Sequence, residues 1–441
     1  MLPGCLASVQ GAVDEIVLVD TGSRDATRRL AEEAGARVVE QPWRDDFSEP
    51  RNAALARATG DWILQLDADE RLAPGAASGL RAAADRGGFD VGLLRLHNAA
   101  RVDAEPREVL TGQARLGAAI LLPRLIRRAD RVHYSGIIHE SVEESFGEPG
   151  ARLDTLPVDV VHLGAAPDLR AAAGKRERNL RLLRRRCLLE PDSTTPFGYL
   201  AMELLEAGQL AEAAEAAEAG WGKVGAQPHH RSIHLLAVAR GLTALRAGAV
   251  ERLIETAEQA LVRERGGPDL QFLLGCGLET RALGLGSSDP AQARLLERAA
   301  VAYLRATGAV PGDVGQVIVE GAASWASATR LGTIRLLQGR MDEAGDAFDA
   351  ASKAFPGHLE ARLGQLEVRL AQGDFQRVLA QVEPLLGADP DGWLLAAAAA
   401  RGLGALDHAR VFFAAARERA RSGYLSPHRR QRHRELGASL S

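Results

Sequence analysis

Residues 1–165 alternate short apolar runs with segments of helical periodicity, and this alternation constrains the fold more than any other feature of the chain. Three of the runs have the length and composition of strands: "EIVLVD" (15–20), "RVVE" (37–40) and "WILQLD" (62–67). Helical patterns at 23–35 and 48–60 lie between them. Strands that alternate with helices need crossover connections, which favour a parallel sheet buried on both faces. We therefore predict an α/β domain over residues 1–165.

The ends of the two helical patterns carry capping residues. Ser23 and Ser48 are the expected N-caps, and Gly35 and Gly60 are the expected C-terminal stops. After residue 90 the alternation is looser, and three further strands are expected: 91–97, 118–126 and 156–163.

Residues 166–441 have an almost continuous helical pattern rich in Ala, Leu, Arg and Glu. Two pairs of landmarks are separated by 34 positions: Gly339 and Gly373, and Pro356 and Pro390. A helix–turn–helix period of 34 residues is typical of the tetratricopeptide repeat. The alternative is two adjacent helical hairpins of similar length. We predict an all-α repeat domain that is clearest over 331–420, and only helical hairpins between 225 and 325.

Composition excludes some classes of partner. With 54 basic and 58 acidic residues the net charge is −4, which gives no reason to expect nucleic acid. The three scattered cysteines suit a reducing compartment, and no apolar run approaches the roughly 20 residues of a membrane span. We expect a cytoplasmic protein without a transmembrane segment.

Three acids follow the third apolar run directly: Asp67, Asp69 and Glu70. Ligands of open parallel sheets bind beyond the carboxyl ends of the strands. Converging carboxylates repel one another unless a cation lies among them. The sequence therefore predicts a divalent cation and a diphosphate at this strand end, and the alternative is a solvated acidic turn.

Five segments, in order, resemble one family: "VDEIVLVDTGSRDAT", "WRDDFSEPRNAAL", "ATGDWILQLDADERL", "PRLIRRADRVHYSGIIHES" and "VVHLG". Together they resemble the family 2 glycosyltransferases of the A-type fold, and in particular the bacterial branch with tetratricopeptide repeats behind the catalytic domain. The resemblance covers residues 2–165.

The resemblance implies roles for individual residues around a nucleotide sugar. Asp20 matches the acid that contacts the base, and Ser23 belongs to the motif that shapes the next turn. Arg51 matches a position near the nucleotide, and Asp67 an acid near the ribose. Asp69 matches the direct ligand of Mn²⁺ or Mg²⁺.

The resemblance further implies an inverting transfer from a nucleoside-diphosphate sugar, with a UDP-sugar as the first candidate. His162 matches a late histidine that completes the metal shell, and a structural hydrogen bond is its alternative role. His139 and Glu140 match a motif that faces the acceptor. Glu140 is the first candidate for the catalytic base and Glu70 the second, although either could instead orient a neighbour or form a salt bridge.

One strand of the family pattern has no counterpart in this sequence. The pattern opens with an apolar strand ending in Lys-Asn-Glu, immediately before the helix that "LPGCLASVQG" (2–11) resembles. That strand would lie in the middle of the sheet beside 15–20, and its neighbours would have unpaired backbone groups without it. Three explanations are open: a start codon assigned too late, a truncated gene, or a rearranged sheet without activity.

A second hypothesis is a tetratricopeptide scaffold with a vestigial transferase domain. A nucleotidyltransferase is a weaker third, because no Gly-rich triphosphate loop is evident. For the helical repeats we expect a protein or peptide acceptor, or a homodimer contact. The segment "LRLLRRR" (180–186) is interpreted as one basic face of a helix, without a function.

Overall fold

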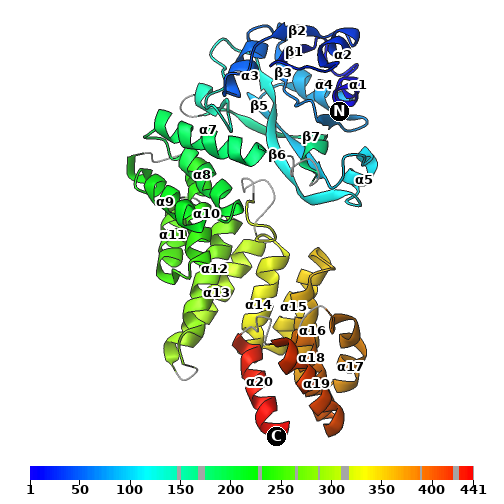
Figure 1. The fold of residues 1–441 in the computed structure, drawn as a ribbon, viewed down its shortest axis with the longest axis vertical. Coiled ribbons are helices and arrows are strands. Elements are labelled where there is room, and N and C mark those ends of the chain that lie inside the picture. The colour runs from blue at the N-terminus through cyan, green and yellow to red at the C-terminus, as the bar shows by residue number, and fades with distance from the viewer. Residues whose placement is uncertain are drawn as a thin grey trace. The chain divides into compact units, whose positions relative to one another are not determined.

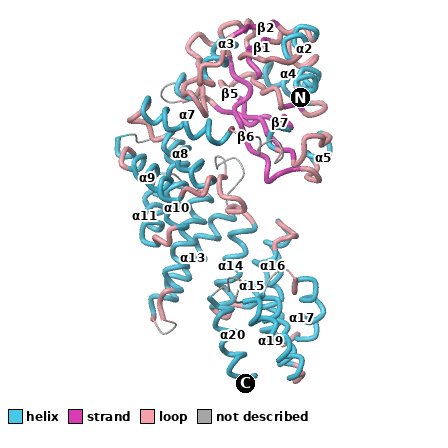
Figure 2. Tube along the Cα trace, in the orientation of Figure 1, coloured by secondary structure: helices cyan, strands magenta, loops and turns pink. Residues whose placement is uncertain are grey.

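The structure is a computed structural model that describes residues 1–146, 150–166, 174–226, 231–263, 267–286, 289–308, 317–387, 390–420 and 427–440. The chain forms two compact units, residues 1–209 and 210–441 (Figure 1). The first contains all the strands described below, and the second is helical (Figure 2).

Unit 1 begins with α/β structure and ends with two helices. Its strands are β1 (Val17–Asp20), β2 (Arg37–Glu40), β3 (Trp62–Leu64), β4 (Glu70–Leu72), β5 (Val91–Ala99), β6 (Arg115–Arg127) and β7 (Leu153–His162). Its helices are α1 (Leu2–Ser8), α2 (Thr27–Glu33), α3 (Ser48–Leu55), α4 (Ala76–Arg86), α5 (Pro106–Leu110), α7 (Lys175–Leu189) and α8 (Thr195–Glu206). All six strands predicted from the sequence are present, and the short strand β4 is an addition.

The main sheet has five strands in the order β3-β6-β5-β7-β4. β5 lies at its centre, and Leu94 and Leu96 of β5 join Leu156 and Val158 of β7 in the buried core. The predicted fold class is confirmed, but the expectation of a mostly parallel sheet is wrong. Only β1–β2 and β5–β7 pair parallel, and the other three pairings are antiparallel. For β5 and β6 the reason is that the connection through the short helix α5 turns the chain back beside β5 instead of crossing over to a parallel neighbour.

The sheet is divided where the family pattern has a strand that this sequence lacks. β1 pairs with β2 in a separate two-stranded sheet, and β3 is an edge strand of the five-stranded sheet. Among the described residues, β1 and β3 therefore each have one edge without a ladder partner. Asp20 and the Asp67 turn follow these two strands, so the division lies within the region of the predicted site.

Three of the predicted helix ends are wrong, and one of them is Gly60, because α3 already ends at Leu55. α2 begins at Thr27 rather than after Ser23, and α3 begins at Ser48 itself. The Asp46 carboxylate accepts hydrogen bonds from the amides of Ser48 (2.7 Å) and Glu49 (3.3 Å), and therefore acts where Ser48 was expected to act. Gly35 does follow the end of α2 with a positive φ of 82°, as predicted.

Unit 2 consists of helical hairpins. Its helices are α9 (Leu210–Trp221), α10 (Arg231–Arg246), α11 (Val250–Arg263), α12 (Pro268–Leu283), α13 (Pro290–Thr307), α14 (Trp325–Leu337), α15 (Met341–Ala354), α16 (Leu359–Ala371), α17 (Phe375–Val382), α18 (Pro390–Gly402), α19 (Leu406–Ala420) and α20 (Pro427–Leu440). The predicted repeats over 331–420 correspond to α14–α15, α16–α17 and α18–α19. The helical hairpins expected between 225 and 325 are α10–α11 and α12–α13.

The same glycine turn follows α8, α10, α14, α16 and α18. Gly208, Gly248, Gly339, Gly373 and Gly404 have φ values of 75°, 69°, 73°, 82° and 76°. In each turn the glycine amide donates to the carbonyl three residues earlier, and the next amide donates to the carbonyl five residues earlier. This is a Schellman motif, in which only glycine adopts the left-handed conformation without strain.

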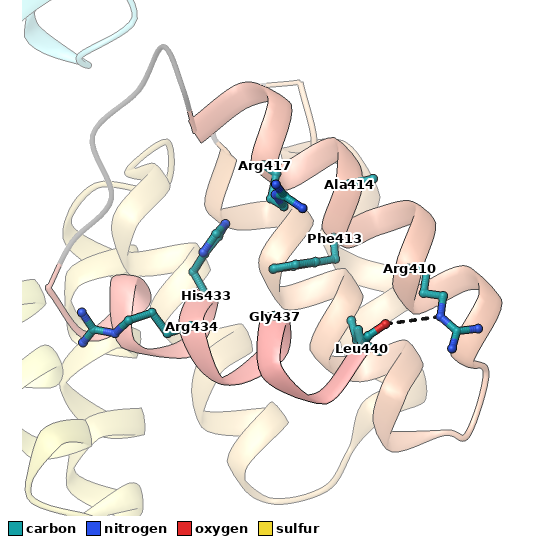
Figure 3. A pocket seen from close by; sticks show the side chains of 8 residues that line it. All are labelled: Arg410, Phe413, Ala414, Arg417, His433, Arg434, Gly437 and Leu440. Carbon is teal, nitrogen blue, oxygen red and sulfur yellow. Dashed lines mark hydrogen bonds between the residues drawn. The ribbon is translucent and has the colours of Figure 1, made fainter.

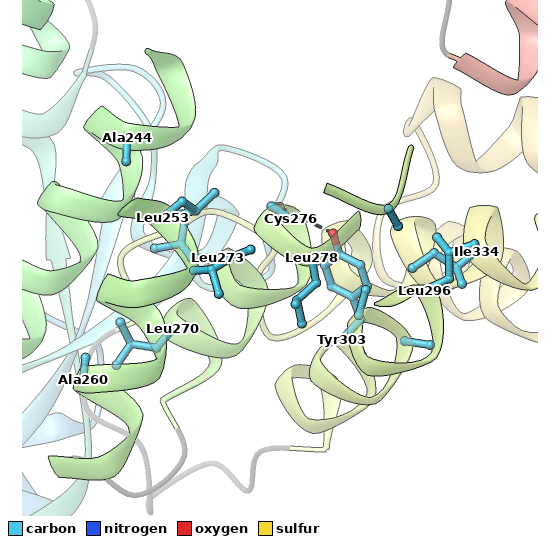
Figure 4. Packing of buried hydrophobic residues seen from close by; sticks show 14 of the residues in the cluster. Ala244, Leu253, Ala260, Leu270, Leu273, Cys276, Leu278, Leu296, Tyr303 and Ile334 are labelled. Carbon is cyan, nitrogen blue, oxygen red and sulfur yellow. Dashed lines mark hydrogen bonds between the residues drawn. The ribbon is translucent and has the colours of Figure 1, made fainter. Parts of the chain in front are cut away.

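Aromatic side chains fill the spaces between the helices of unit 2 next to glycines. Phe348 of α15 is 1% exposed and packs against Gly332 of α14 and Gly364 of α16, where a Cβ atom would overlap its ring. Tyr303 of α13 packs against Gly275 of α12 in the cluster shown in Figure 4. A glycine on one helix thus admits a ring from an adjacent helix.

The division into units differs from the change in secondary structure. Strands give way to helices after residue 165, whereas α7 and α8 belong to the compact unit that contains the sheet. The predicted boundary at 165/166 remains a prediction. Within the described part of the chain, no helix combines the length and the hydrophobicity that crossing a bilayer requires.

Candidate active site

A tight turn between β3 and β4 carries the three acids. The Glu70 amide donates to the Asp67 carbonyl (2.9 Å), and the Asp67 amide donates to the Glu70 carboxylate (3.1 Å). In this turn the three acidic side chains differ in their exposure to solvent. The Asp67 and Asp69 side chains are 42% and 30% exposed, whereas that of Glu70 is 2% exposed.

Glu70 is held inside the domain by Arg124 of β6. Its carboxylate forms an ion pair with the Arg124 guanidinium, which also lies 3.6 Å from Asp67 Oδ2. Burial raises the pKa of Glu70, and the charge of Arg124 opposes this shift. A buried carboxylate with a paired cation can stabilise the turn, which is one of the alternatives that the sequence left open for Glu70.

Arg51 of α3 connects Asp67 with Glu140. Arg51 Nη2 lies 3.0 Å from Asp67 Oδ1, and Arg51 Nε donates to Glu140 Oε1. The guanidinium also lies 5.6 Å from the centre of the Tyr134 ring. Burial raises the pKa of Tyr134 to about 12, so this phenol is neutral at physiological pH. The structure thus brings together three predicted site residues from segments far apart in the sequence.

Asp69 faces His162 at the end of β7. His162 Nε2 lies 3.6 Å from Asp69 Oδ2, and His162 Nδ1 lies 2.9 Å from Asn98 Oδ1. The Asn98 contact engages Nδ1 and leaves Nε2 facing the Asp69 carboxylate, and hydrogen bonding from His162 lowers the pKa of Asp69. Gly164 makes room for this pair, because a Cβ atom there would overlap Asp69 Oδ2.

Asp69 and His162 offer the types of ligand atom that bind divalent cations. A carboxylate oxygen and an imidazole nitrogen that face each other are stabilised by a shared cation or by a proton on Nε2. The hydrogen bond from Nδ1 to Asn98 is of the kind that orients metal-binding histidines. Mixed oxygen and nitrogen ligands suit Mn²⁺ better than Mg²⁺. Among the described residues, no group of three or more His, Cys, Asp or Glu side chains is arranged to hold a metal.

Asp20 and Ser23 form a separate feature after β1. Asp20 is 5% exposed, and its carboxylate accepts hydrogen bonds from the Ser23 amide at 3.1 and 3.3 Å. Arg28 Nε lies 3.6 Å from the same carboxylate. The partners of this carboxylate lie in the 20–28 segment, so Asp20 and Ser23 shape their own turn. Their contact with a nucleotide stays a prediction.

Sequence reasoning missed four residues that organise this region: Asn98, Arg124, Tyr134 and Gly164. Arg124 had a detectable signal, because it is a lone charge inside the apolar run 118–126, and a charge buried in a strand needs a partner. The positions of Asn98 and Gly164 become meaningful only when β5 and β7 are placed side by side, and that of Tyr134 only when its loop lies against α3.

A cavity of about 450 Å³ lies between α19 and α20 in unit 2 (Figure 3). Its lining is basic and apolar: Arg410, Phe413, Ala414, Arg417, His433, Arg434, Gly437 and Leu440. None of the predicted site residues lines it.

Known proteins resemble this chain in its N-terminal α/β part and in its helical part. Residues 1–136 match the sequence profile of Glycosyl transferase family 2. The chain is 39% identical over 184 residues to a TPR repeat-containing protein of Synechococcus elongatus, covering 40% of this chain and 42% of that protein. It is 42% identical over 65 residues to an uncharacterized glycosyltransferase of Rickettsia felis, covering 15% of this chain and 23% of that protein.

The chain thus spans less than half the length of either curated relative. A solved tetratricopeptide repeat protein from Parabacteroides merdae aligns with a TM-score of 0.40 and 13% identity, over 60% of this chain and 93% of that one. Residues 1–136 therefore have the sequence profile of a family 2 glycosyltransferase domain, and helical hairpins with a 34-residue spacing follow in the C-terminal part.

Proposed function

We propose that the protein is an inverting, metal-dependent glycosyltransferase of the hexosyltransferase type, which transfers a sugar from a nucleoside-diphosphate sugar to an acceptor. The observation that carries this proposal is the position of Asp67 and Asp69. Both are partly exposed beyond the carboxyl end of β3, with Arg51 beside the first and His162 facing the second. A UDP-sugar is the first candidate donor.

In this proposal Asp69 and His162 hold Mn²⁺ or Mg²⁺, and the cation neutralises charge on the diphosphate leaving group. Arg51 provides a further positive charge near the nucleotide, and Asp67 contacts the ribose. Asp20 and Ser23 remain the proposed contacts to the base.

Glu140 is the proposed base that deprotonates the acceptor. Its side chain is 9% exposed, and its ion pair with Arg51 fixes its orientation. Glu70 is the weaker candidate because it is enclosed under the turn and paired with Arg124. A base must reach the acceptor proton directly or through one water.

The acceptor is proposed to be a protein or peptide bound by the helical repeats, because stacked hairpins present extended binding surfaces. Mass spectrometry of co-expressed partner proteins tests this proposal. An added hexose on a partner supports it, and transfer only to small-molecule acceptors contradicts it. Formation of a homodimer is the other proposed role of the repeats.

The central test is binding of UDP in the presence of MnCl₂, measured by calorimetry. We expect binding that EDTA removes and that Asp69→Asn weakens by about 100-fold, because the carboxylate charge next to the cation is lost. Asp85→Asn, on the exposed face of α4, is the matched control and should leave the affinity unchanged. If the wild-type protein binds no nucleoside diphosphate with any divalent cation, the transferase proposal is wrong.

The alternative function is a repeat-based scaffold with a vestigial transferase domain. It is favoured by the divided sheet, in which β1 and β3 each lack a ladder partner on one edge among the described residues. The binding test decides between the two functions, since a scaffold needs no nucleotide.

A further inference from the structure

We propose that helix α7 positions the acidic site, because its arginines fix the loop that leads into α3, where Arg51 lies, and the hairpin that carries Glu140. Residues 174–190 belong to unit 1 but lie beyond the 1–136 segment that matches the family. The basic segment 180–186, which had no function from the sequence, is part of this helix. The effect on nucleotide binding rests on the proposed function, whereas the effect on the loops does not.

The first loop is the hairpin 135–141, which carries Glu140. Its ends are joined by the Ser135 amide to the Ser141 carbonyl (2.9 Å) and by the reciprocal bond (3.1 Å). Its backbone includes two residues with positive φ, Gly136 at 89° and His139 at 51°. Positive φ is unfavourable for histidine, so contacts from outside the loop must stabilise this conformation.

Arg186 of α7 supplies those contacts. Its guanidinium donates from Nη1 to the carbonyls of Ile138 (2.6 Å) and His139 (3.2 Å). Arg186 is 2% exposed. Its Nε donates to Glu190 Oε1 at 2.8 Å, and this bond further fixes the orientation of the guanidinium. Carbonyls that accept from a buried, charged donor are held more strongly than carbonyls that face water.

Gly136 and Tyr199 complete the fit around this hairpin. The guanidinium lies over Gly136, where a Cβ atom would overlap it. The His139 ring stacks on Tyr199 of α8 with 3.9 Å between centroids and 5° between planes. The hairpin is therefore held by both helices that follow the sheet.

The second loop precedes α3 and is held by the same helix. Arg181 forms two hydrogen bonds to the Asp45 carboxylate, at 2.7 and 2.8 Å, and Asp45 also has a positive φ of 59°. The Arg178 guanidinium lies 5.1 Å from the centre of the Phe47 ring. α3 begins directly after this loop, and Arg51 lies in its first turn.

The two loops are also joined to each other. The Phe47 amide donates to the Ile137 carbonyl (2.9 Å), next to the carbonyls that Arg186 binds. Arg51 and Glu140 therefore meet because one helix fixes both of their backbones. Since Arg51 also contacts Asp67, the position of α7 decides how the site acids are aligned. Arg186 is buried away from any substrate, so it is a positioning residue and not a catalytic one.

The test compares Arg186→Met and Arg186→Lys with the control Arg176→Ala, an exposed arginine on the same helix. Hydrogen exchange measures the loops, and calorimetry with UDP and MnCl₂ measures the site. In Arg186→Met we expect about tenfold faster exchange over 135–141 and about tenfold weaker binding, with β5 and β7 unchanged. In Arg186→Lys the exchange rate over 135–141 and the UDP affinity should lie between those of Arg186→Met and the wild type, because an ammonium group cannot reproduce the planar guanidinium. Arg176→Ala should match the wild type.

Gly136→Ala, which strains the backbone at a φ of 89° and also places a Cβ atom against the guanidinium, should accelerate exchange over 135–141 as well, and it keeps the proposal testable if Arg186→Met does not fold. Unchanged exchange over 135–141 in folded Arg186 variants would overturn the proposal. Faster exchange with unchanged UDP affinity would overturn the positioning role. If the wild type binds no UDP, the proposed function fails, and exchange over 46–55 and 135–141 alone decides whether α7 holds both loops.

Discussion

The turns of the helical unit close over short sequence distances, whereas the predicted site in the unit with the sheet is assembled over long ones. In the helical unit, each glycine turn is closed by hydrogen bonds to carbonyls three and five residues away. In the unit with the sheet, Arg51 pairs with Glu140 across 89 positions and Arg124 with Glu70 across 54. Local contacts leave a signal in a single sequence, whereas distant ones require the fold to be known.

The comparison also separates two kinds of stability. Hairpin repeats contact mainly their neighbours, so a destabilising substitution in one repeat should affect only that repeat and the adjacent ones. The sheet and its site depend on distant pairs, so damage to one pair should affect several elements. The four predictions that follow test this difference, in order of expected effect.

Phe348→Ala should destabilise the region of α14–α16 by about 4 kcal/mol, because it leaves a cavity between two glycines that cannot close it. Hydrogen exchange should accelerate in these helices and remain unchanged in α10 and α11. The control Phe355→Ala removes a ring that is 45% exposed and should have a much smaller effect. Equal acceleration throughout unit 2 would show that the repeats are not independent.

Glu70→Gln should destabilise the main sheet by about 2 kcal/mol, because Arg124 keeps its position but loses the charge of its partner. Exchange should increase in β3, β4 and β6 together, since the pair joins β4 to β6. Glu33→Gln, at an exposed position of α2, is the matched control. An effect confined to β4 would contradict the idea that distant pairs couple elements.

Acid should weaken the pair formed by Asp90 and Arg152, which precede β5 and β7. Hydrogen bonds from Arg152 lower the pKa of Asp90 to about 2 from the usual 3.8. As the pH falls, the Asp90 carboxylate therefore takes up its proton in the unfolded state first. The pair contributes at most about 2 kcal/mol to the free energy of unfolding. This contribution is present above pH 4 and is lost as the pH falls towards 2. In Asp90→Asn the free energy of unfolding should depend less on pH in this window, and an unchanged slope would exclude the pair.

Gly339→Ala should cost about 1 kcal/mol, because alanine is strained at the positive φ of the turn. Gly345→Ala, within α15, should instead stabilise by roughly 0.5 to 1 kcal/mol, since its φ is helical and a Cβ atom has space. Thermal unfolding of the two variants measures this difference. The same sign for both would show that the turn conformation is not the reason for the glycine.

Much of the fold could be predicted from local pattern. The apolar runs gave the six strands within a few residues, and the 34-residue spacing located the hairpins of 331–420. The failures have local causes as well. The capping role expected of Ser48 is taken by Asp46, because the helix begins at Ser48 itself and the Asp46 carboxylate accepts from its first two amides. β4 was missed because three residues of mixed polarity carry no period.

The candidate site could be predicted only in part. Asp67, Asp69, Arg51, Glu140 and His162 were named from the sequence, and the structure brings them into two contacting groups. Asn98, Gly164 and Arg186 were not identified, because each gains its role from a partner more than 45 positions away.

The sequence alone therefore determined the class of the fold, the repeat period and which acids follow a strand, because these depend on neighbours along the chain. Tertiary structure alone decided that Glu70 is buried under Arg124, that Asp69 faces His162, and that α7 fixes the loop that leads into α3 and the hairpin that carries Glu140. The physical reason is that burial and charge pairing depend on which distant segments meet, and pairing across the sheet selects those segments.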